Sequence, residues 1–250
     1  MFWRSLQRWR GIALVGLAVV ATLIFAVSDQ LVLYIHPRYI VFTVVMVVIA
    51  LVLVVASLLH RGHGDEADDE PRRGVRALAI TAAAVAGVMA VGMVLLPPAT
   101  LSATTAQQRD LNSTALNAST QTVDAATDAS AAAVASFTVL DRASLLRQTS
   151  DLAFYADKPV DVVGFVAASP DDPENVFYVS RFFVTCCAVD AQPAGVPVYQ
   201  PGWSAQFPED SWVQVTGVFA TNPSSGSAEP LAIDPAQILP VEQPREPYLF

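Results

Sequence analysis

The stretch Ile40–Leu59, IVFTVVMVVIALVLVVASLL, decides how this chain is built. It contains no charged residue, and its only polar members are Thr43 and Ser57. A helix rises about 1.5 Å per residue, so a run of about 20 residues crosses the roughly 30 Å hydrocarbon core of a bilayer. Lipid offers no hydrogen-bond partner to the open edge of a strand, so a helix is the expected form. We therefore predict a transmembrane helix over residues 40–59.

Two further apolar runs flank this stretch, Gly11–Val27 and Ala77–Leu96. Each approaches the length that a membrane helix needs. The sequence therefore predicts a three-helix membrane domain over residues 1–97, with spans near 11–27, 40–59 and 77–96. Charged residues at membrane depth mark transport pathways, and these runs have none. We expect the spans to form an anchor and a docking surface rather than a channel.

Basic residues set the predicted orientation of the spans. Three arginines precede the first span and four lie between the second and third, whereas the loop between the first two contains only Arg38. By the positive-inside rule the N-terminus is cytoplasmic, and three spans then place the C-terminal part outside the cytoplasm. The sequence thus predicts a multi-pass protein of the cell membrane. In the alternative, the first span is a signal peptide cleaved near Ser28, which leaves the exported location unchanged.

The rest of the chain divides into a linker and a domain. Residues 98–136 are mostly Ala, Ser, Thr, Asn, Gln and Asp and contain no aromatic residue. Such a segment buries too little apolar surface to offset the entropy lost on ordering, so we expect a flexible or loosely helical linker. Residues 137–250 have the composition of a globular domain, which we predict to be exported and rich in β-structure.

Five apolar runs separated by Pro, Gly, Ser and Asp predict the strands of this domain. They are Val160–Ala168, Val176–Cys187, Val196–Gln200, Trp212–Ala220 and Leu231–Leu239. A helix capped by Asp141 is expected before them, over Asp141–Leu152. Five short strands with one flanking helix favour a small OB-like barrel. Gly164 and Gly217 lie mid-strand, where a barrel requires tight coiling.

Composition excludes several functions for the exported domain. The net charge of −9 is concentrated after Pro97, and an acidic surface repels the phosphates of nucleic acids. All three histidines, His36, His60 and His63, precede the domain, which therefore cannot hold a Ser-His-Asp or Cys-His arrangement. Neither common glycine-rich nucleotide motif appears. We expect a protein that binds no nucleic acid and is not an enzyme.

The only two cysteines, Cys186 and Cys187, are adjacent and are followed by Asp190. On the predicted strand their side chains would point to opposite faces. Three interpretations stay open. In the first, the two cysteines pack as small residues at the end of a strand. In the second, the two thiolates and Asp190 bind zinc or copper(I), with further ligands from a partner. In the third, the two cysteines are a redox couple. A disulfide between neighbours is strained and easily reduced, because adjacent Cα atoms lie about 3.8 Å apart.

His36 lies in the predicted outer loop, on the same side of the membrane as the cysteines. Its imidazole is a candidate metal ligand, and Arg38 is a candidate contact for an anion. The alternative is an interfacial turn in which Pro37 begins the second helix. His60 and His63 lie in the predicted cytoplasmic loop, where we expect a solvated charged segment.

At several of these places the sequence resembles a known family. The matching segments are Tyr34-Ile35-His36-Pro37-Arg38, Pro98-Ala-Thr-Leu-Ser102, Arg181–Asp190 and Trp212-x-x-Val-x-Gly217. They resemble the YcgQ-like family of bacterial permease subunits, and Cys-Cys-Ala-x-Asp is the most specific part. The resemblance implies a companion multi-span permease and a link to metal homeostasis, with zinc as the candidate ion. It would place Cys186, Cys187 and Asp190 at the family's signature.

Three functions follow from these expectations. The first is an accessory, non-catalytic subunit of a two-part membrane permease, whose exported domain binds a metal ion or contacts the permease. Its metal ligands would be Cys186, Cys187, Asp190 and His36. The second is a membrane-anchored envelope thiol-redox protein that uses the cysteine pair. The third is a membrane-anchored adaptor or sensor without metal.

Overall fold

The computed structural model describes residues 2–59, 81, 85, 88, 92, 100–109, 111–113 and 121–250. They belong to two compact units, Met1–Ala99 and Thr100–Phe250. The predicted third span, residues 77–96, lies largely outside the described residues. So does the predicted cytoplasmic loop with His60 and His63.

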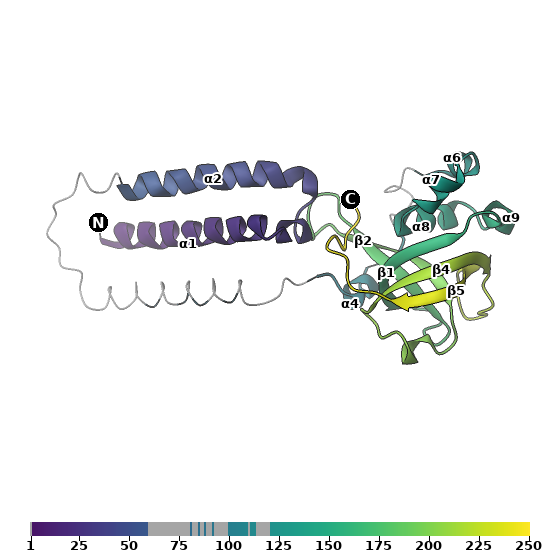
Figure 1. Ribbon diagram of the computed structural model, residues 1–250. Helices are drawn as coiled ribbons and strands as arrows, with labels where there is room; N and C mark the ends of the chain where they lie inside the picture. Colours follow the sequence, from purple (N-terminus) through teal and green to yellow (C-terminus); the bar gives the residue numbers. More distant parts are fainter. Residues whose placement is uncertain are drawn as a thin grey trace. The chain divides into compact units, whose positions relative to one another are not determined.

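The first unit contains two long helices, α1 (Phe2–Val27) and α2 (Pro37–Leu59), joined through the short 3-10 helix η1 (Gln30–Leu33) (Figure 1). Within α2, Pro37–Ala56 is long and apolar enough to cross a membrane, judged by length and composition. Many of its apolar side chains, Val41 and Leu53 among them, are exposed. The apolar stretch of α1, Val15–Val27, is shorter. The described residues therefore show one candidate membrane helix, where the sequence predicts three spans.

The second unit is built on a mostly antiparallel sheet that closes on itself. Its strands are β1 (Val160–Ala168), β2 (Val176–Phe183), β3 (Gln192–Tyr199), β4 (Trp212–Thr221) and β5 (Leu231–Pro240). They follow the order β1-β2-β3-β5-β4, and β4 pairs back onto β1. The pairing of β3 with β5 is parallel, through Val198 and Ile233. The prediction of a mostly-β domain with five strands is thus confirmed, with strand ends that differ by a few residues.

The core of this unit consists of apolar side chains that the closed sheet surrounds. Trp203, from the 3-10 helix η3 (Trp203–Ala205), packs on Phe177 with ring centroids 5.3 Å apart. Tyr155 packs on Phe219 at 4.8 Å. Burying each such aromatic ring removes a large apolar surface from water, so these contacts hold the helical elements against the strands.

Four short helices gather on one side of the sheet beside β1 (Figure 1). They are α6 (Val123–Thr127), α7 (Ala131–Ala135), α8 (Val139–Gln148) and α9 (Leu152–Tyr155). The predicted cap of α8 is one turn displaced: Thr138 is the N-cap, and Asp141 closes a capping box with it from the third helical position. Thr149 leaves the helix in an extended conformation, so the predicted helix 141–152 is divided into α8 and α9.

The described parts of the predicted linker differ from a flexible tether, because they pack on the sheet. In α4 (Ala103–Gln107), Ala103 and Ala106 are fully buried. The buried Asn112 side chain accepts a hydrogen bond from the Gly195 N–H and donates one to the Gly195 carbonyl, both at 2.8 Å. Among the described strands, β3 pairs with β5 only at Val198. The Asn112 side chain therefore satisfies backbone groups on an edge of β3 that is otherwise unpaired at Gly195.

Candidate functional site

The cysteine pair lies in a loop that begins where β2 ends. The prediction of a strand through Cys187 is wrong, because β2 ends at Phe183. The strand ends there because the Asp190 carboxylate accepts hydrogen bonds from three backbone N–H groups. These belong to Thr185 at 3.2 Å, Cys186 at 2.8 Å and Cys187 at 3.3 Å. The Asp190 N–H in turn donates to the Cys187 carbonyl at 2.9 Å. Such local bonds compete with strand pairing and fold the chain into a turn.

This turn brings three metal-ligating groups together. The Sγ atoms of Cys186 and Cys187 and a carboxylate oxygen of Asp190 lie within 4.8 Å of one another. Two thiolates on one tetrahedral zinc ion, with Zn–S of about 2.3 Å, are about 3.8 Å apart, so small adjustments would suffice. Cys186 is exposed and Cys187 half-buried, which does not fit the interpretation of a packed pair at a strand end.

The surroundings of the loop disfavour a free thiolate at Cys186. Desolvation, the Cys187 thiol and the Asp190 carboxylate together raise the pKa of the Cys186 thiol above its ordinary value. Reactive redox cysteines have the opposite property, a pKa lowered by nearby positive groups. A metal cation would reverse the balance at this loop, since it stabilises thiolates and displaces their protons.

Distant parts of the second unit hold both ends of the loop, one through a side chain and the other through backbone groups. The Arg109 guanidinium donates to the carbonyls of Ala191 and Val189, the latter at 3.4 Å. At the other end, the Val184 N–H donates to the Leu249 carbonyl at 2.9 Å, and Leu249 pairs with Phe183. Sequence reasoning missed Arg109, because a single arginine in a polar segment carries no signal of its distant contact.

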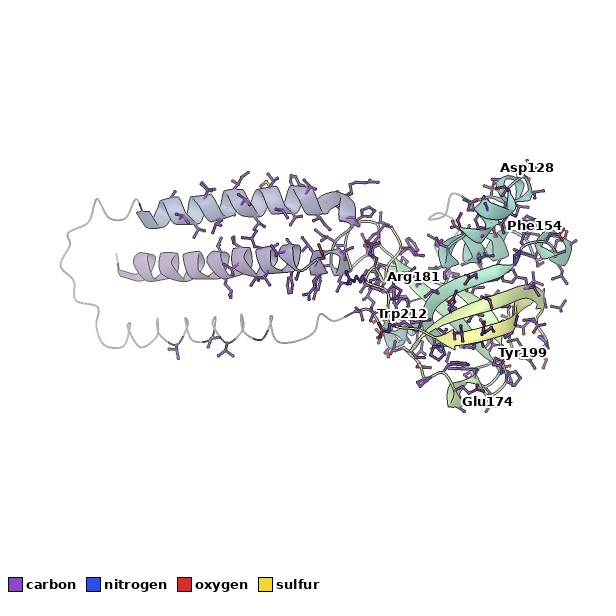
Figure 2. The ribbon with its side chains drawn as sticks, viewed as in Figure 1. Asp128, Phe154, Glu174, Arg181, Tyr199 and Trp212 are labelled. Carbon is purple, nitrogen blue, oxygen red and sulfur yellow. The ribbon has the colours of Figure 1, made fainter. Side chains whose placement is uncertain are left out.

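The C-terminal tail is fixed next to the loop by Arg181. Its Nε donates to the Pro247 carbonyl at 3.2 Å, and its guanidinium also donates to the Glu246 carbonyl. The same guanidinium lies over the ring of Trp212, 5.7 Å from the centroid. Figure 2 labels both residues. Arg181 and Trp212, both in segments that carry the family resemblance, therefore organise the tail beside the cysteine loop rather than contribute metal ligands.

His36 belongs to the first unit, where it precedes α2. Its Nδ1 accepts the Arg38 N–H at 3.0 Å, and Pro37 is the first residue of the helix. This local structure agrees with the alternative interpretation, a turn in which Pro37 begins the helix. The imidazole accepts a hydrogen bond from a backbone N–H of the first helical turn. A role for His36 as a metal ligand stays a prediction.

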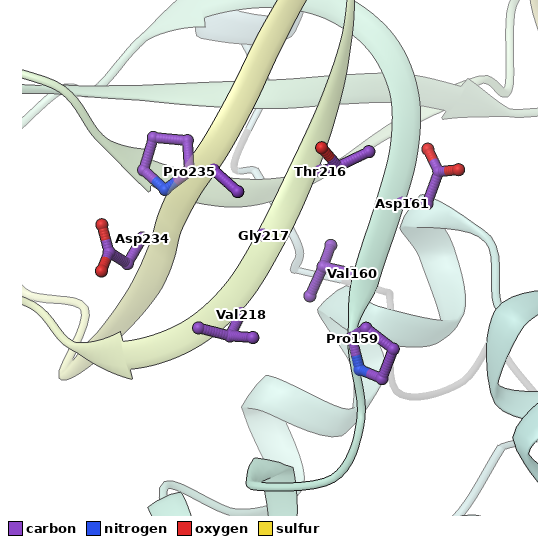
Figure 3. A pocket seen from close by; sticks show the side chains of 9 residues that line it. Pro159, Val160, Asp161, Thr216, Gly217, Val218, Asp234 and Pro235 are labelled. Carbon is purple, nitrogen blue, oxygen red and sulfur yellow. The ribbon is translucent and has the colours of Figure 1, made fainter.

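A second feature of the domain is an open hollow of about 450 Å³ over β1, β4 and β5 (Figure 3). Its lining is mainly apolar, with Asp161 and Asp234 at its sides (Figure 3). The Asp161 carboxylate accepts a hydrogen bond from the Gln214 amide at 2.8 Å. Gly217 forms part of the lining, and a Cβ there would lie 2.3 Å from the Asp234 carbonyl oxygen. The close approach of β4 and β5 thus requires glycine at this point of the lining, and we assign the hollow no ligand.

Two family matches cover most of the chain. Residues 9–112 match the DUF1980 N-terminal domain, and residues 117–250 match the DUF1980 C-terminal domain. The second match includes the closed sheet and the cysteine loop. No curated protein and no solved structure matches the chain.

Proposed function

The chain belongs to the DUF1980 family, and from that premise we propose a function for it. It is a membrane-anchored, non-catalytic subunit of a two-part bacterial permease. Its extracytoplasmic domain binds a thiophilic metal ion, with zinc as the first candidate, through Cys186, Cys187 and Asp190. The observation that carries the proposal is the gathering of these three ligand groups within 4.8 Å in one turn.

The ligand set suits delivery of an ion better than permanent storage. Structural zinc sites are closed by four protein ligands, whereas sites that exchange a ligand keep a position open. Two thiolates and one carboxylate supply three ligands and leave the fourth position to water or to a group from the partner. Exposure of Cys186 gives that partner access. An open, exposed site on an anchored domain fits a subunit that passes a metal ion to or from a permease.

The membrane and fold parts of the proposal have separate support. The apolar stretch Pro37–Ala56 supports an anchor, and the apolar runs at 11–27 and 77–96 support the three-span, multi-pass arrangement. The closed five-stranded order supports an OB-like barrel for the second unit. The sequence resemblance to the YcgQ-like family supports the multi-span permease as partner.

Zinc titration of the full-length protein in detergent, against a chelating dye of known affinity, tests the metal-binding part. We expect one zinc ion per chain, lost when Cys186 and Cys187 are both replaced by alanine and weakened in Asp190→Asn. Asp234→Asn, which removes an exposed carboxylate from the hollow, serves as the matched control and should bind like the wild type. A protein that binds no zinc or copper(I) but cycles between dithiol and disulfide would support the thiol-redox function instead.

The extracytoplasmic location has a direct test because the chain contains only two cysteines. A membrane-impermeant maleimide added to intact cells should label the wild-type protein and leave the double alanine variant unlabelled. Labelling that requires cell lysis would place the domain in the cytoplasm and overturn the proposed orientation.

A further inference from the structure

Arg109 contacts the backbone on both sides of the proposed ligand Asp190. Its two terminal nitrogens donate to the carbonyls of Val189 and Ala191, the residues immediately before and after Asp190. A guanidinium is the side chain best suited to this task, because its planar fork presents several donors in a fixed geometry. The two bonds hold the backbone before and after Asp190 and so restrict where its carboxylate points.

The backbone of Arg109 is itself anchored on both sides. Before it, the Ala103 N–H at the start of α4 donates to the Asp210 carboxylate. After it, the Asn112 side chain is bonded to both backbone groups of Gly195. Arg109 therefore extends from a segment that is fixed to the sheet at two points, which reduces the entropy lost when its guanidinium binds the loop.

We propose that Arg109 is the positioning residue of the metal-binding loop, an inference that rests on the function proposed above. It holds the turn in which the Asp190 carboxylate accepts the N–H groups of Cys186 and Cys187, so that both thiols and the carboxylate meet before an ion arrives. Residues that orient metal ligands without touching the metal change metal affinity by about 10- to 100-fold when they are replaced.

The Arg109 contact and metal binding strengthen each other. If the bound ion stabilises the turn that Arg109 holds, then the Arg109 contacts raise the affinity for the ion by the same factor.

Hydrogen exchange and zinc affinity of the full-length protein in detergent test this role together. In metal-free Arg109→Gln we expect the amides of residues 185–187 to exchange about tenfold faster, while those of the strands are unchanged. Zinc should bind about 10- to 100-fold more weakly. Arg109→Lys keeps the charge but loses the two-pronged contact, so it should lie between Arg109→Gln and the wild type. Arg245→Gln removes an exposed arginine from the C-terminal tail and is the matched control for the loss of charge.

The outcomes separate the two proposals. If the cysteine variants lose zinc while Arg109→Gln matches Arg245→Gln in exchange and affinity, the positioning role is overturned and the proposed function stands. If the wild type binds no metal while Arg109→Gln still speeds exchange at 185–187, the proposed function is overturned and Arg109 keeps its role in holding the turn. Faster exchange throughout the strands in Arg109→Gln would mean a general loss of folding and would overturn the positioning role.

Discussion

Replacing Asn112 with alanine should destabilise the second unit strongly, although this residue lies in a segment whose composition predicts a tether. The substitution leaves the buried N–H and carbonyl of Gly195 without their partners. Each unsatisfied buried backbone group costs about 1–3 kcal/mol, so the free energy of unfolding should fall by about 2–6 kcal/mol. Asn112 also has a φ of 62°, which adds about 1 kcal/mol for alanine. The sum is a large part of the roughly 5–15 kcal/mol that stabilises a domain.

Urea unfolding of the full-length protein in detergent measures this effect through tryptophan fluorescence. Trp3 and Trp9 are first replaced by phenylalanine, so that the signal comes from Trp203 and Trp212, which both belong to the second unit. With a urea dependence of about 2 kcal/mol per molar, a loss of 4 kcal/mol lowers the midpoint by about 2 M.

Two companion variants identify the cause of the change at Asn112. Asn112→Gly tolerates the positive φ, so it retains only the hydrogen-bond part of the effect. Ser113→Ala alters the exposed neighbour and should leave the midpoint where it is. A midpoint for Asn112→Ala equal to that of Ser113→Ala would refute the claim that this segment completes the edge of β3.

Two further predictions concern the strands and the thiols. Gly217→Ala should destabilise the unit by several kcal/mol, because the new Cβ would lie 2.3 Å from the Asp234 carbonyl oxygen. At Gly226 a Cβ meets only ordinary contacts from 3.5 Å outward, so Gly226→Ala should leave the stability nearly unchanged. The urea midpoints of the two variants check this prediction, and equal midpoints would contradict it. Cys187→Ala should lower the pKa of the Cys186 thiol, because it removes a neighbour that disfavours the thiolate. The pH midpoint of Cys186 alkylation by iodoacetamide should therefore move to lower pH than in the wild type, and an upward shift would show that the cause is wrong.

The strands could be predicted from the sequence because their signal is local. Runs rich in Val, Ile and Phe end at clusters of Pro, Gly and Asp, and β1 occupies the predicted residues 160–168. A barrel was predicted, but the strand pair that closes the sheet was not, since Val198 of β3 and Ile233 of β5 lie far apart in the chain. The apolar runs of the predicted spans are equally local, but among the described residues only Pro37–Ala56 forms a helix long and apolar enough to cross a membrane.

The three residues of the candidate site could be singled out from the sequence, whereas the shape of their loop could not be predicted. The two cysteines of the chain are adjacent and are followed by an aspartate, so the sequence itself draws attention to them. The turn could not be recognised in the same way. It forms because the Asp190 carboxylate accepts hydrogen bonds from three backbone N–H groups, which ends β2 before the cysteines. Asn112 and Arg109 act in the same way, each through hydrogen bonds from one side chain to a distant backbone. The pattern of apolar residues does not indicate such hydrogen bonds. For this reason the polar segment 98–136 was predicted to be a linker.

X-ray absorption at the zinc K-edge tests the central claim most directly. Full-length protein in detergent is loaded with one equivalent of zinc, and the distances from the ion to its ligands are measured. We predict two sulfur ligands at about 2.3 Å with the remainder oxygen or nitrogen at about 2.0–2.2 Å, and no sulfur in the variant that carries alanine at both Cys186 and Cys187. A wild-type spectrum with only oxygen and nitrogen ligands would contradict the assignment of this loop as a metal site.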